Sequence, residues 1–405
     1  MSRTTILILI VLMLFTCSTS SSAEEWKGKK ITKEGTLHVI NPAEPMLPLK
    51  TVTAKELWRV GDDGDEIFFG HAGNVFAGPN NTICIIDAQL KEIMVFSADG
   101  HYIQSVGKVG QGPGEFTIPN SAFTIDNIRI AVMQPTPPKI VCYSLSSDYT
   151  TEMVLPEEIS SGFGATFKAA WVDKILIIYG RHKFFPEKNK TVIDQYYVYG
   201  VSNGTIIAQY YIKDQIGSPL TKMCSEEEEY FIGSKWNVGN SKIYIASERN
   251  IYQIEVWLPS GEKTDRIITR QYHSRQRGKK ELRQIDNLLN SPLRGSDECY
   301  DVSETDEDIM YLYPRDNGTL WVLSSRGYRD RPDGSIGVFD VFDDEGRFIQ
   351  QVSVLGKDDP IHDRYYFLGN RLYVVTNILD TMLLNDGTDK DVNLSPMTLI
   401  CYELE

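Results

Sequence analysis

The chain lacks the short motifs that mark several large classes of enzyme. It has no GxSxG elbow, no phosphate-binding loop, no HExxH, no CxxC pair and no dinucleotide-binding fingerprint. Its six histidines are scattered, and none has a serine or carboxylate partner at a fixed spacing. The sequence therefore offers no motif for serine hydrolysis, zinc-peptidase chemistry or nucleotide-dependent catalysis.

Cysteine is scarce, and five cysteines remain beyond residue 23. An odd number in so long a chain excludes a small disulfide-stapled scaffold. Cys84, Cys142 and Cys401 fall in apolar runs, where cysteine behaves as a small core residue. Cys224 and Cys299 fall in polar inserts, so a disulfide between them in an oxidising compartment is an interpretation that stays open.

Positive charge is also in short supply. The formal net charge is −14 at pH 7, whereas general binding of nucleic acid needs a cationic face that displaces counterions. We therefore expect no nucleic-acid partner. The excess of Asp and Glu is interpreted as a solubilising surface.

Long apolar runs are absent after the first two dozen residues. Ile6–Phe15 is apolar but too short to span a bilayer, and Ser21-Ser22-Ala23 suits a signal peptidase. We interpret residues 1–23 as a signal peptide, with a lipoprotein signal that lipidates Cys17 as the alternative. Either interpretation predicts an exported protein, periplasmic or extracellular, for which a lipid on Cys17 would be the only membrane contact.

What the chain does contain is a series of short apolar strands separated by turn dipeptides. The first unit, about residues 71–107, reads as four strands, with Asp99-Gly100 in its last hairpin turn. With its crossover it has the length of a propeller blade, roughly 40–45 residues. Five further units follow the same pattern. We predict an all-β fold, a six-bladed β-propeller of four-stranded antiparallel blades.

The last unit, which ends at Met397–Glu405, is one strand short. Leu57–Phe68 repeats the pattern of Tyr102–Phe116, which lies between two units. We therefore predict that Glu56–Gly61 completes the last blade and closes the ring, which removes an open sheet edge. The predicted boundaries are a signal peptide at 1–23, a linker at 24–55 and the propeller at 56–405.

One blade carries a more specific signature. Its residues are Asp87, Val95-Phe96, Asp99-Gly100, Gly110, Gly112, Pro113, Gly114, Glu115, Phe116 and Pro119. In this blade the chain resembles the NHL-repeat type of six-bladed β-propeller, of the exported bacterial kind. The resemblance implies the fold and a place outside the cytoplasm. It implies no activity, because such propellers include binding modules, lyases and lactonases.

The expected site lies on the face that carries the long loops. In a propeller, the loops between second and third strands share one face with the crossovers between blades, and here they hold nearly all the long inserts. Six polar residues follow the second strands of the six blades: Arg181, Arg249, Arg326, Asp87, Gln134 and Asn377. We predict that they line a site for a small anionic ligand, because the planar guanidinium suits carboxylate, sulfate or phosphate. The alternative is that each arginine pairs with a carboxylate of a neighbouring blade.

Two crossovers carry opposite charge. Glu226–Glu229 is acidic and Arg270–Arg283 is basic, so the two either pair with each other or form separate solvated faces. Leu282, Ile285 and Leu288 follow a helical spacing. This spacing predicts a short helix over Lys279–Leu289.

Two hypotheses for function follow. The first is a monomeric, non-catalytic, exported propeller that binds a protein or a small anionic ligand on its loop-rich face and uses no cofactor. The second is a metal-dependent enzyme of the lactonase, hydrolase or lyase type, with Ca²⁺ or another divalent ion in the channel. Its candidate ligands are Asn74, Asn120, Asn237 and Glu115.

Overall fold

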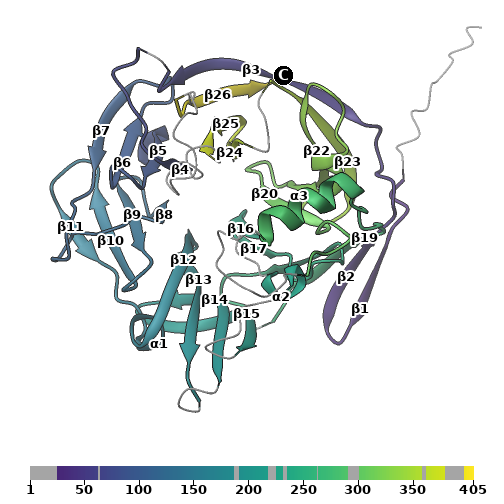
Figure 1. The fold of residues 1–405 in the computed structure, drawn as a ribbon, viewed down its shortest axis with the longest axis horizontal. Coiled ribbons are helices and arrows are strands. Elements are labelled where there is room, and N and C mark those ends of the chain that lie inside the picture. Colours follow the sequence, from purple (N-terminus) through teal and green to yellow (C-terminus); the bar gives the residue numbers. More distant parts are fainter. Residues whose placement is uncertain are drawn as a thin grey trace, which may run out of the picture.

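The computed structural model describes residues 25–62, 64–186, 191–217, 225–230, 235–261, 263–290, 301–357, 362–378 and 396–405. In this part of the chain, six antiparallel blades surround a central channel, and the first strand of each blade is the innermost (Figure 1). The predicted six-bladed β-propeller is therefore confirmed. No helix in the described ranges is long and apolar enough to cross a membrane.

Each blade is a four-stranded meander. Blade 1 consists of β4 (Ala72–Ala77), β5 (Ile83–Asp87), β6 (Glu92–Phe96) and β7 (Tyr102–Val106). Blade 2 consists of β8 (Ser121–Thr124), β9 (Arg129–Gln134), β10 (Lys139–Ser144) and β11 (Thr150–Glu152). Blade 3 consists of β12 (Phe163–Val172), β13 (Ile175–Phe184), β14 (Val192–Ser202) and β15 (Thr205–Gly217). Blade 4 consists of β16 (Trp236–Gly239), β17 (Lys242–Ile245), β18 (Gln253–Trp257) and β19 (Arg266–Arg270). Blade 5 consists of β20 (Ile309–Pro314), β21 (Leu320–Ser324), β22 (Ser335–Phe342) and β23 (Phe348–Leu355). Blade 6 consists of β24 (Arg364–Leu368), β25 (Arg371–Val375) and β26 (Leu399–Leu404), and it is completed by β3 (Lys50–Val60).

Blade 6 closes the ring as predicted. Strand β26 pairs antiparallel with β3, from Leu399 opposite Val60 to Leu404 opposite Ala54. The final blade therefore takes its outermost strand from the N-terminal part of the chain, so that no blade is left one strand short.

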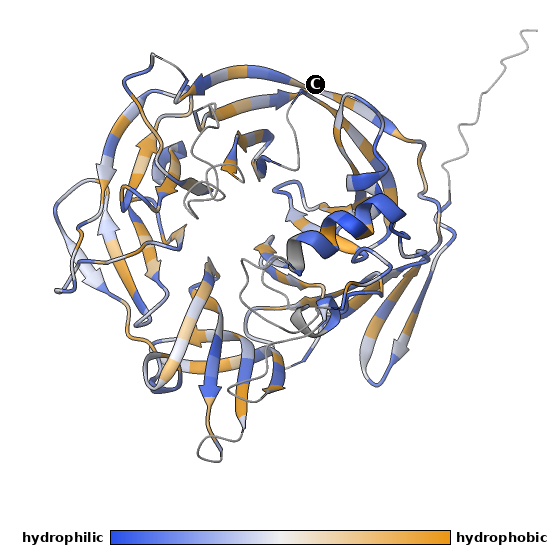
Figure 2. Cartoon of the chain, in the orientation of Figure 1, coloured by the Kyte–Doolittle hydropathy of each residue, from blue (hydrophilic) through white to orange (hydrophobic). Residues whose placement is uncertain are grey.

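The core lies between the blades. Six apolar clusters are present, one at each interface between neighbouring blades. At the interface of blades 5 and 6, for example, Phe339 packs with Phe367 and Leu372. Apolar residues accordingly run along the strands of every blade (Figure 2). Because each blade buries its two faces against its neighbours, the ring is stabilised as one unit.

The predicted linker at 24–55 is wrong in one respect, because most of it is strand. Strands β1 (Lys29–Lys33) and β2 (Thr36–Asn41) form a hairpin, and β2 pairs in parallel with β19 of blade 4. The first part of β3 pairs in parallel with β23 of blade 5 before its second part joins blade 6. Residues 25–60, here called the N-terminal strap, thus bind the outer edges of three consecutive blades (Figure 1).

The innermost strand of blade 4 also differs from the expected one. The sequence pattern predicts it at Tyr230–Trp236, whereas β16 begins at Trp236 and ends at Gly239. Asn240 and Ser241 both adopt positive φ, 52° and 53°. They form a two-residue turn into β17, which fixes the end of β16 at Gly239.

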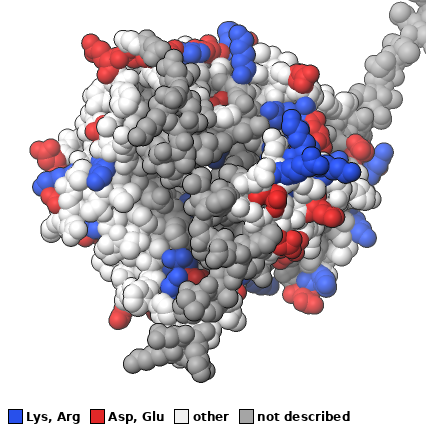
Figure 3. Space-filling view, in the orientation of Figure 1, with Lys and Arg blue, Asp and Glu red and all other residues white. Residues whose placement is uncertain are grey.

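Helices are few in the described residues. They are α1 (Glu157–Ser160), α2 (Glu226–Glu229), α3 (Lys279–Leu289) and α4 (Ser325–Arg329). Helix α3 has the predicted bounds and lies on the loop-rich face (Figure 1). Lys and Arg gather around this part of that face, with Asp and Glu beside them (Figure 3).

Candidate functional site: a central channel

Asp87 and Gln134 serve the scaffold. The buried carboxylate of Asp87 accepts hydrogen bonds from the backbone N–H groups of Gly70 and His71, at 2.7 and 3.1 Å, and from two N–H groups in the turn after β5. In blade 2, the side-chain oxygen of Gln134 accepts from Thr117, and its amide nitrogen donates to the carbonyl of Pro137. Each side chain ties an incoming crossover to the loop after the second strand, and its polar atoms are occupied by the protein.

Arg249 also has a scaffold position. It is 8% exposed, and its guanidinium donates to the Thr305 carbonyl at 2.8 Å and to the side chains of Asn250 and Ser303. The distance from this guanidinium to the Glu226 carboxylate is 3.9 Å. These contacts join the loop after β17 to the crossover between blades 4 and 5, so the donors of Arg249 face protein groups.

Arg181 and Arg326 each contact their own surroundings. Arg181 lies 3.3 Å from the carboxylate of Asp194, on the neighbouring strand β14 of the same blade. Arg326, in α4, donates to the carbonyl of His273 at 3.0 Å and lies 3.8 Å from Asp330, with its side chain 48% exposed. No described cavity is lined jointly by these two arginines and Arg249.

The two oppositely charged crossovers contact each other. Arg277 binds Glu226 and Asp306, the latter at 2.7 Å, and Asp306 also accepts from Arg275 at 2.8 Å. The pairing interpretation therefore holds for Glu226. Within the described residues this network fixes the two crossovers to each other on the loop-rich face.

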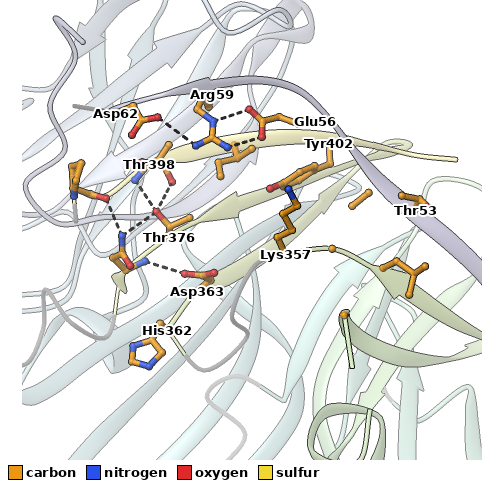
Figure 4. A pocket seen from close by; sticks show the side chains of 17 residues that line it. Thr53, Glu56, Arg59, Asp62, Lys357, His362, Asp363, Thr376, Thr398 and Tyr402 are labelled. Atoms are coloured by element: carbon orange, nitrogen blue, oxygen red, sulfur yellow. Dashed lines mark hydrogen bonds and ion pairs between the residues drawn. The ribbon is translucent and has the colours of Figure 1, made fainter. Parts of the chain in front are cut away.

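Asn377 lines an open pocket of about 950 Å³ at the seam between blade 5, blade 6 and β3. Its backbone N–H donates to Asp363 at 3.0 Å, and its amide donates to the carbonyl of Pro396 (Figure 4). The guanidinium of Arg59, in the same pocket, forms two hydrogen bonds with Glu56, at 2.6 and 2.7 Å, and one with Asp62 (Figure 4). That cation is already neutralised, and Lys357, which also lines the pocket, is exposed to water, which makes this pocket less suited to an anion.

The central channel is a second, smaller cavity of about 560 Å³. Residues of all six innermost strands line it, and aromatic side chains dominate the walls formed by blades 4 to 6. The aromatic lining residues of these blades are Trp236, Tyr311, Tyr313, Tyr328, Tyr365, Tyr366 and Phe367. Apolar walls with a few polar groups are typical of cavities that bind small molecules.

Lys168 is a basic residue in this channel. Its Nζ donates to the carbonyl of Trp236 at 2.6 Å and lies 4.4 Å from the centroid of the Trp236 ring. Among the described residues no carboxylate forms an ion pair with it. Burial lowers the pKa of Lys168 to about 8, because the channel wall solvates an ammonium ion poorly.

Arg364 is the second basic residue of the channel. Its guanidinium donates a hydrogen bond to the backbone carbonyl of its sequence neighbour Asp363 at 3.3 Å. Asp316 and Asp363 also line the channel, and in the part of the chain that the structure describes no carboxylate lies within 4 Å of the guanidinium. Tyr366 lies on the same strand, and its hydroxyl oxygen accepts from the N–H of Asn74 at 2.9 Å. Burial raises the pKa of Tyr366, so this hydroxyl keeps its proton and remains a donor.

A family model described as a 6-bladed beta-propeller, DUF5128, matches residues 65–317. The chain belongs to this family. No curated protein sequence matches the chain.

Solved structures share the propeller fold at low identity. An exported-type protein of Bacteroides fragilis is 12% identical with a TM-score of 0.50, and the match covers 90% of this chain and 99% of that one. A DUF4221 member from Bacteroides vulgatus is 10% identical with a TM-score of 0.47 over 87% and 98%. Regucalcin, a calcium-binding protein of Agrobacterium tumefaciens, is 10% identical with a TM-score of 0.40 over 88% and 96%. Such likeness concerns fold alone.

Of the four candidate metal ligands, Asn74 lines the channel, and the other three have other contacts. The amides of Asn120 and Asn237 donate to carbonyls of the next blade, Phe167 and Leu312. Glu115 lies in a crossover, where it binds Lys108 at 2.9 Å, and it does not line the channel. Among the described residues, no three His, Cys, Asp or Glu side chains form a group that could hold a metal ion.

Three of the sequence-based predictions fall outside the described residues: the signal peptide, lipidation of Cys17, and the Cys224–Cys299 disulfide. Cys84, Cys142 and Cys401 are buried free thiols, as their apolar surroundings predict. Lys168 and Arg364 are not among the predicted site residues, because the sequence places the long inserts in loops whereas both residues lie on innermost strands. Both residues have the same spacing from the first hairpin turn of their blade, and this repeat was the signal in the sequence that could have identified them.

Proposed function

We propose that this propeller binds a small anionic ligand in its central channel. The observation that carries the proposal is the presence of two cationic side chains, Lys168 and Arg364, on the wall of one cavity without an ion-paired carboxylate among the described residues. A charge in a poorly solvated site favours a counterion, because the interaction is screened less than at the surface.

The comparison with the seam pocket supports the channel. In the seam pocket the guanidinium of Arg59 is held by Glu56 and Asp62, so an added anion would compete with two carboxylates. The other lysine or arginine that lines this pocket, Lys357, is exposed, so water screens its charge. In the channel, the donors of Lys168 and Arg364 contact neutral carbonyl groups. Such contacts orient the cation and leave its charge available to a ligand.

The proposal keeps the non-catalytic, exported hypothesis and moves its site from the loop rim to the channel. The sequence features that support export are the apolar run at Ile6–Phe15 and the small residues at 21–23. The similarity of blade 1 to NHL-type propellers supports the same placement. On this view the long loops surround the entrance of a ligand-binding channel.

The test is titration calorimetry on the chain that begins at residue 24, at low ionic strength, with phosphate, benzoate and terephthalate as probes. We expect at least one probe to bind, and K168M, R364M or both to weaken it by roughly 10–100-fold, the range of a charged hydrogen bond. K263M and R283M are matched controls, because both residues are exposed. The proposal fails if no probe binds, or if the controls weaken binding as much as the channel variants do.

A further inference from the structure

Resting on the proposed function, the geometry points to a more specific ligand class: we infer that the channel takes a small molecule with two anionic groups at opposite ends of an apolar or aromatic middle. Lys168 would hold one end and Arg364 the other. The inference depends on where the two cations lie relative to each other in the ring.

The two cations are on opposing blades. Lys168 belongs to β12 of blade 3 and Arg364 to β24 of blade 6, and in a six-bladed ring these blades face each other across the channel (Figure 1). Both side chains line the same cavity. A ligand that met both cations would therefore span the channel.

The two cations also lie at the same height. In blade 3, Lys168 pairs with Tyr179 and the strand pairing ends at Val172 opposite Ile175. In blade 6, Arg364 pairs with Val375 and the pairing ends at Leu368 opposite Arg371. Lys168 and Arg364 each lie four residues before the last paired residue of their own strand. The turns that follow, 173–174 and 369–370, are of equal length. Equivalent register on equivalent strands places them at one level of the channel.

Among the described residues that line the channel, Lys168 and Arg364 are the only lysine and arginine. Two carboxylates, Asp316 and Asp363, line it as well, and in the described part of the chain neither forms an ion pair with Lys168 or Arg364. Asp363 accepts a hydrogen bond from the backbone N–H of Asn377. The channel thus carries two cations without an ion-paired carboxylate among the described residues.

The walls between the two cations suit an apolar middle. Trp236 lies beside Lys168, Tyr366 shares a strand with Arg364, and Phe76 and Phe123 belong to the lining contributed by blades 1 and 2. Aromatic faces favour a flat or apolar segment, and burial of such a segment adds affinity without charge. The ligand class is therefore an aromatic or aliphatic dicarboxylate, or a molecule with phosphate at one or both ends.

The experiment compares diacids with their half-amides, which have nearly the same shape and one charge fewer. Calorimetry would use terephthalate against 4-carbamoylbenzoate, and glutarate, adipate and suberate against their half-amides, on the wild-type chain, K168M and R364M. We expect one diacid length to bind at least about tenfold more tightly than its half-amide, and each variant to remove that preference while binding the half-amide comparably to the wild type.

Two results would overturn the inference, and they are separable. In the first result, half-amides bind as tightly as diacids and only one of the two variants weakens their binding. The channel then holds a single anion, so the proposed function stands and the inference of a ligand with two anionic groups fails. If no acid binds to the wild-type chain, both fail. K263M again shows whether a change reflects net charge alone, because Lys263 is exposed on a hairpin turn.

Discussion

The Nζ of Lys168 donates a hydrogen bond to the backbone carbonyl of Trp236 in the next blade, at 2.6 Å, and the ammonium lies over the Trp236 ring. Both contacts are with neutral groups. The lysine therefore links two blades at the level of the channel while its charge remains without a carboxylate among the described residues. The pH dependence of stability and of binding follows from this position.

Replacing Lys168 by Met should stabilise the unliganded protein at neutral pH. Burial lowers the pKa of Lys168 from 10.5 to about 8, which corresponds to a penalty of up to roughly 3 kcal/mol for keeping the ammonium charged. Between about pH 8 and pH 10.5, Lys168 is protonated in the unfolded chain but has lost its proton in the folded chain. The destabilisation by the buried charge is therefore complete below pH 8, and it disappears as the pH rises towards 10.5. Urea unfolding of wild type and K168M at pH 7 and pH 10 measures it. Equal destabilisation by K168M at both values would contradict the buried-charge account.

Affinity for an anion should fall as the pH rises above about 8. The ligand binds the charged lysine, whereas the free protein loses that proton with a pKa of about 8. Above this value the free protein must take up a proton to bind, so the affinity falls by up to tenfold per pH unit. Calorimetry in two buffers of different ionisation enthalpy would report the proton uptake in the wild type. In K168M the uptake should be absent; its persistence there would assign the proton to another group.

Asn41 should be among the most important residues of the N-terminal strap. Its buried side chain accepts from Trp26 and from the N–H of Phe348, and donates to the carbonyls of Thr269 and Gly346. Asn41→Ala leaves polar groups of blades 4 and 5 without a partner. We expect a loss of about 2–4 kcal/mol in unfolding free energy by urea denaturation. Asn370→Ala, at an exposed turn, is the control and should change it little.

Graded truncation should separate the two roles of the strap. A chain that begins at residue 50 loses β1 and β2 but keeps β3, so the ring stays closed and we expect a monomer of lower melting temperature. A chain that begins at residue 64 also loses β3, which leaves the edges of both β23 and β26 open. Such edges promote association, and light scattering should show aggregation. If the shorter chain stays monomeric with an unchanged melting temperature, ring closure by β3 is not required.

The fold was predictable because its signals are local. Strand alternation, turn dipeptides such as Asp99-Gly100 and the missing strand at the C-terminal end specify the blades and their closure. The strap between 25 and 55 was not predicted, because parallel pairing of β2 with β19 joins residues more than two hundred positions apart. Its prolines at 42, 45 and 48 resemble those of a linker, and they lie between the strands.

The site was less predictable than the fold. Residues after the second strands do occupy equivalent places, yet Asp87, Gln134 and Arg249 serve the scaffold there. Whether a polar side chain faces protein or a cavity depends on its neighbours in the adjacent blade, which sequence spacing does not give. Lys168 and Arg364 become a pair only when blades 3 and 6 are known to face each other.

The most direct measurement is a crystal structure of the chain soaked with selenate, with anomalous data collected at the selenium edge. The account predicts a selenium peak inside the channel, within hydrogen-bonding reach of Lys168 or Arg364, and its disappearance in the K168M R364M double variant. Peaks confined to the outer surface or to the seam pocket around Arg59, with an empty channel, would contradict the proposal that the channel binds anions.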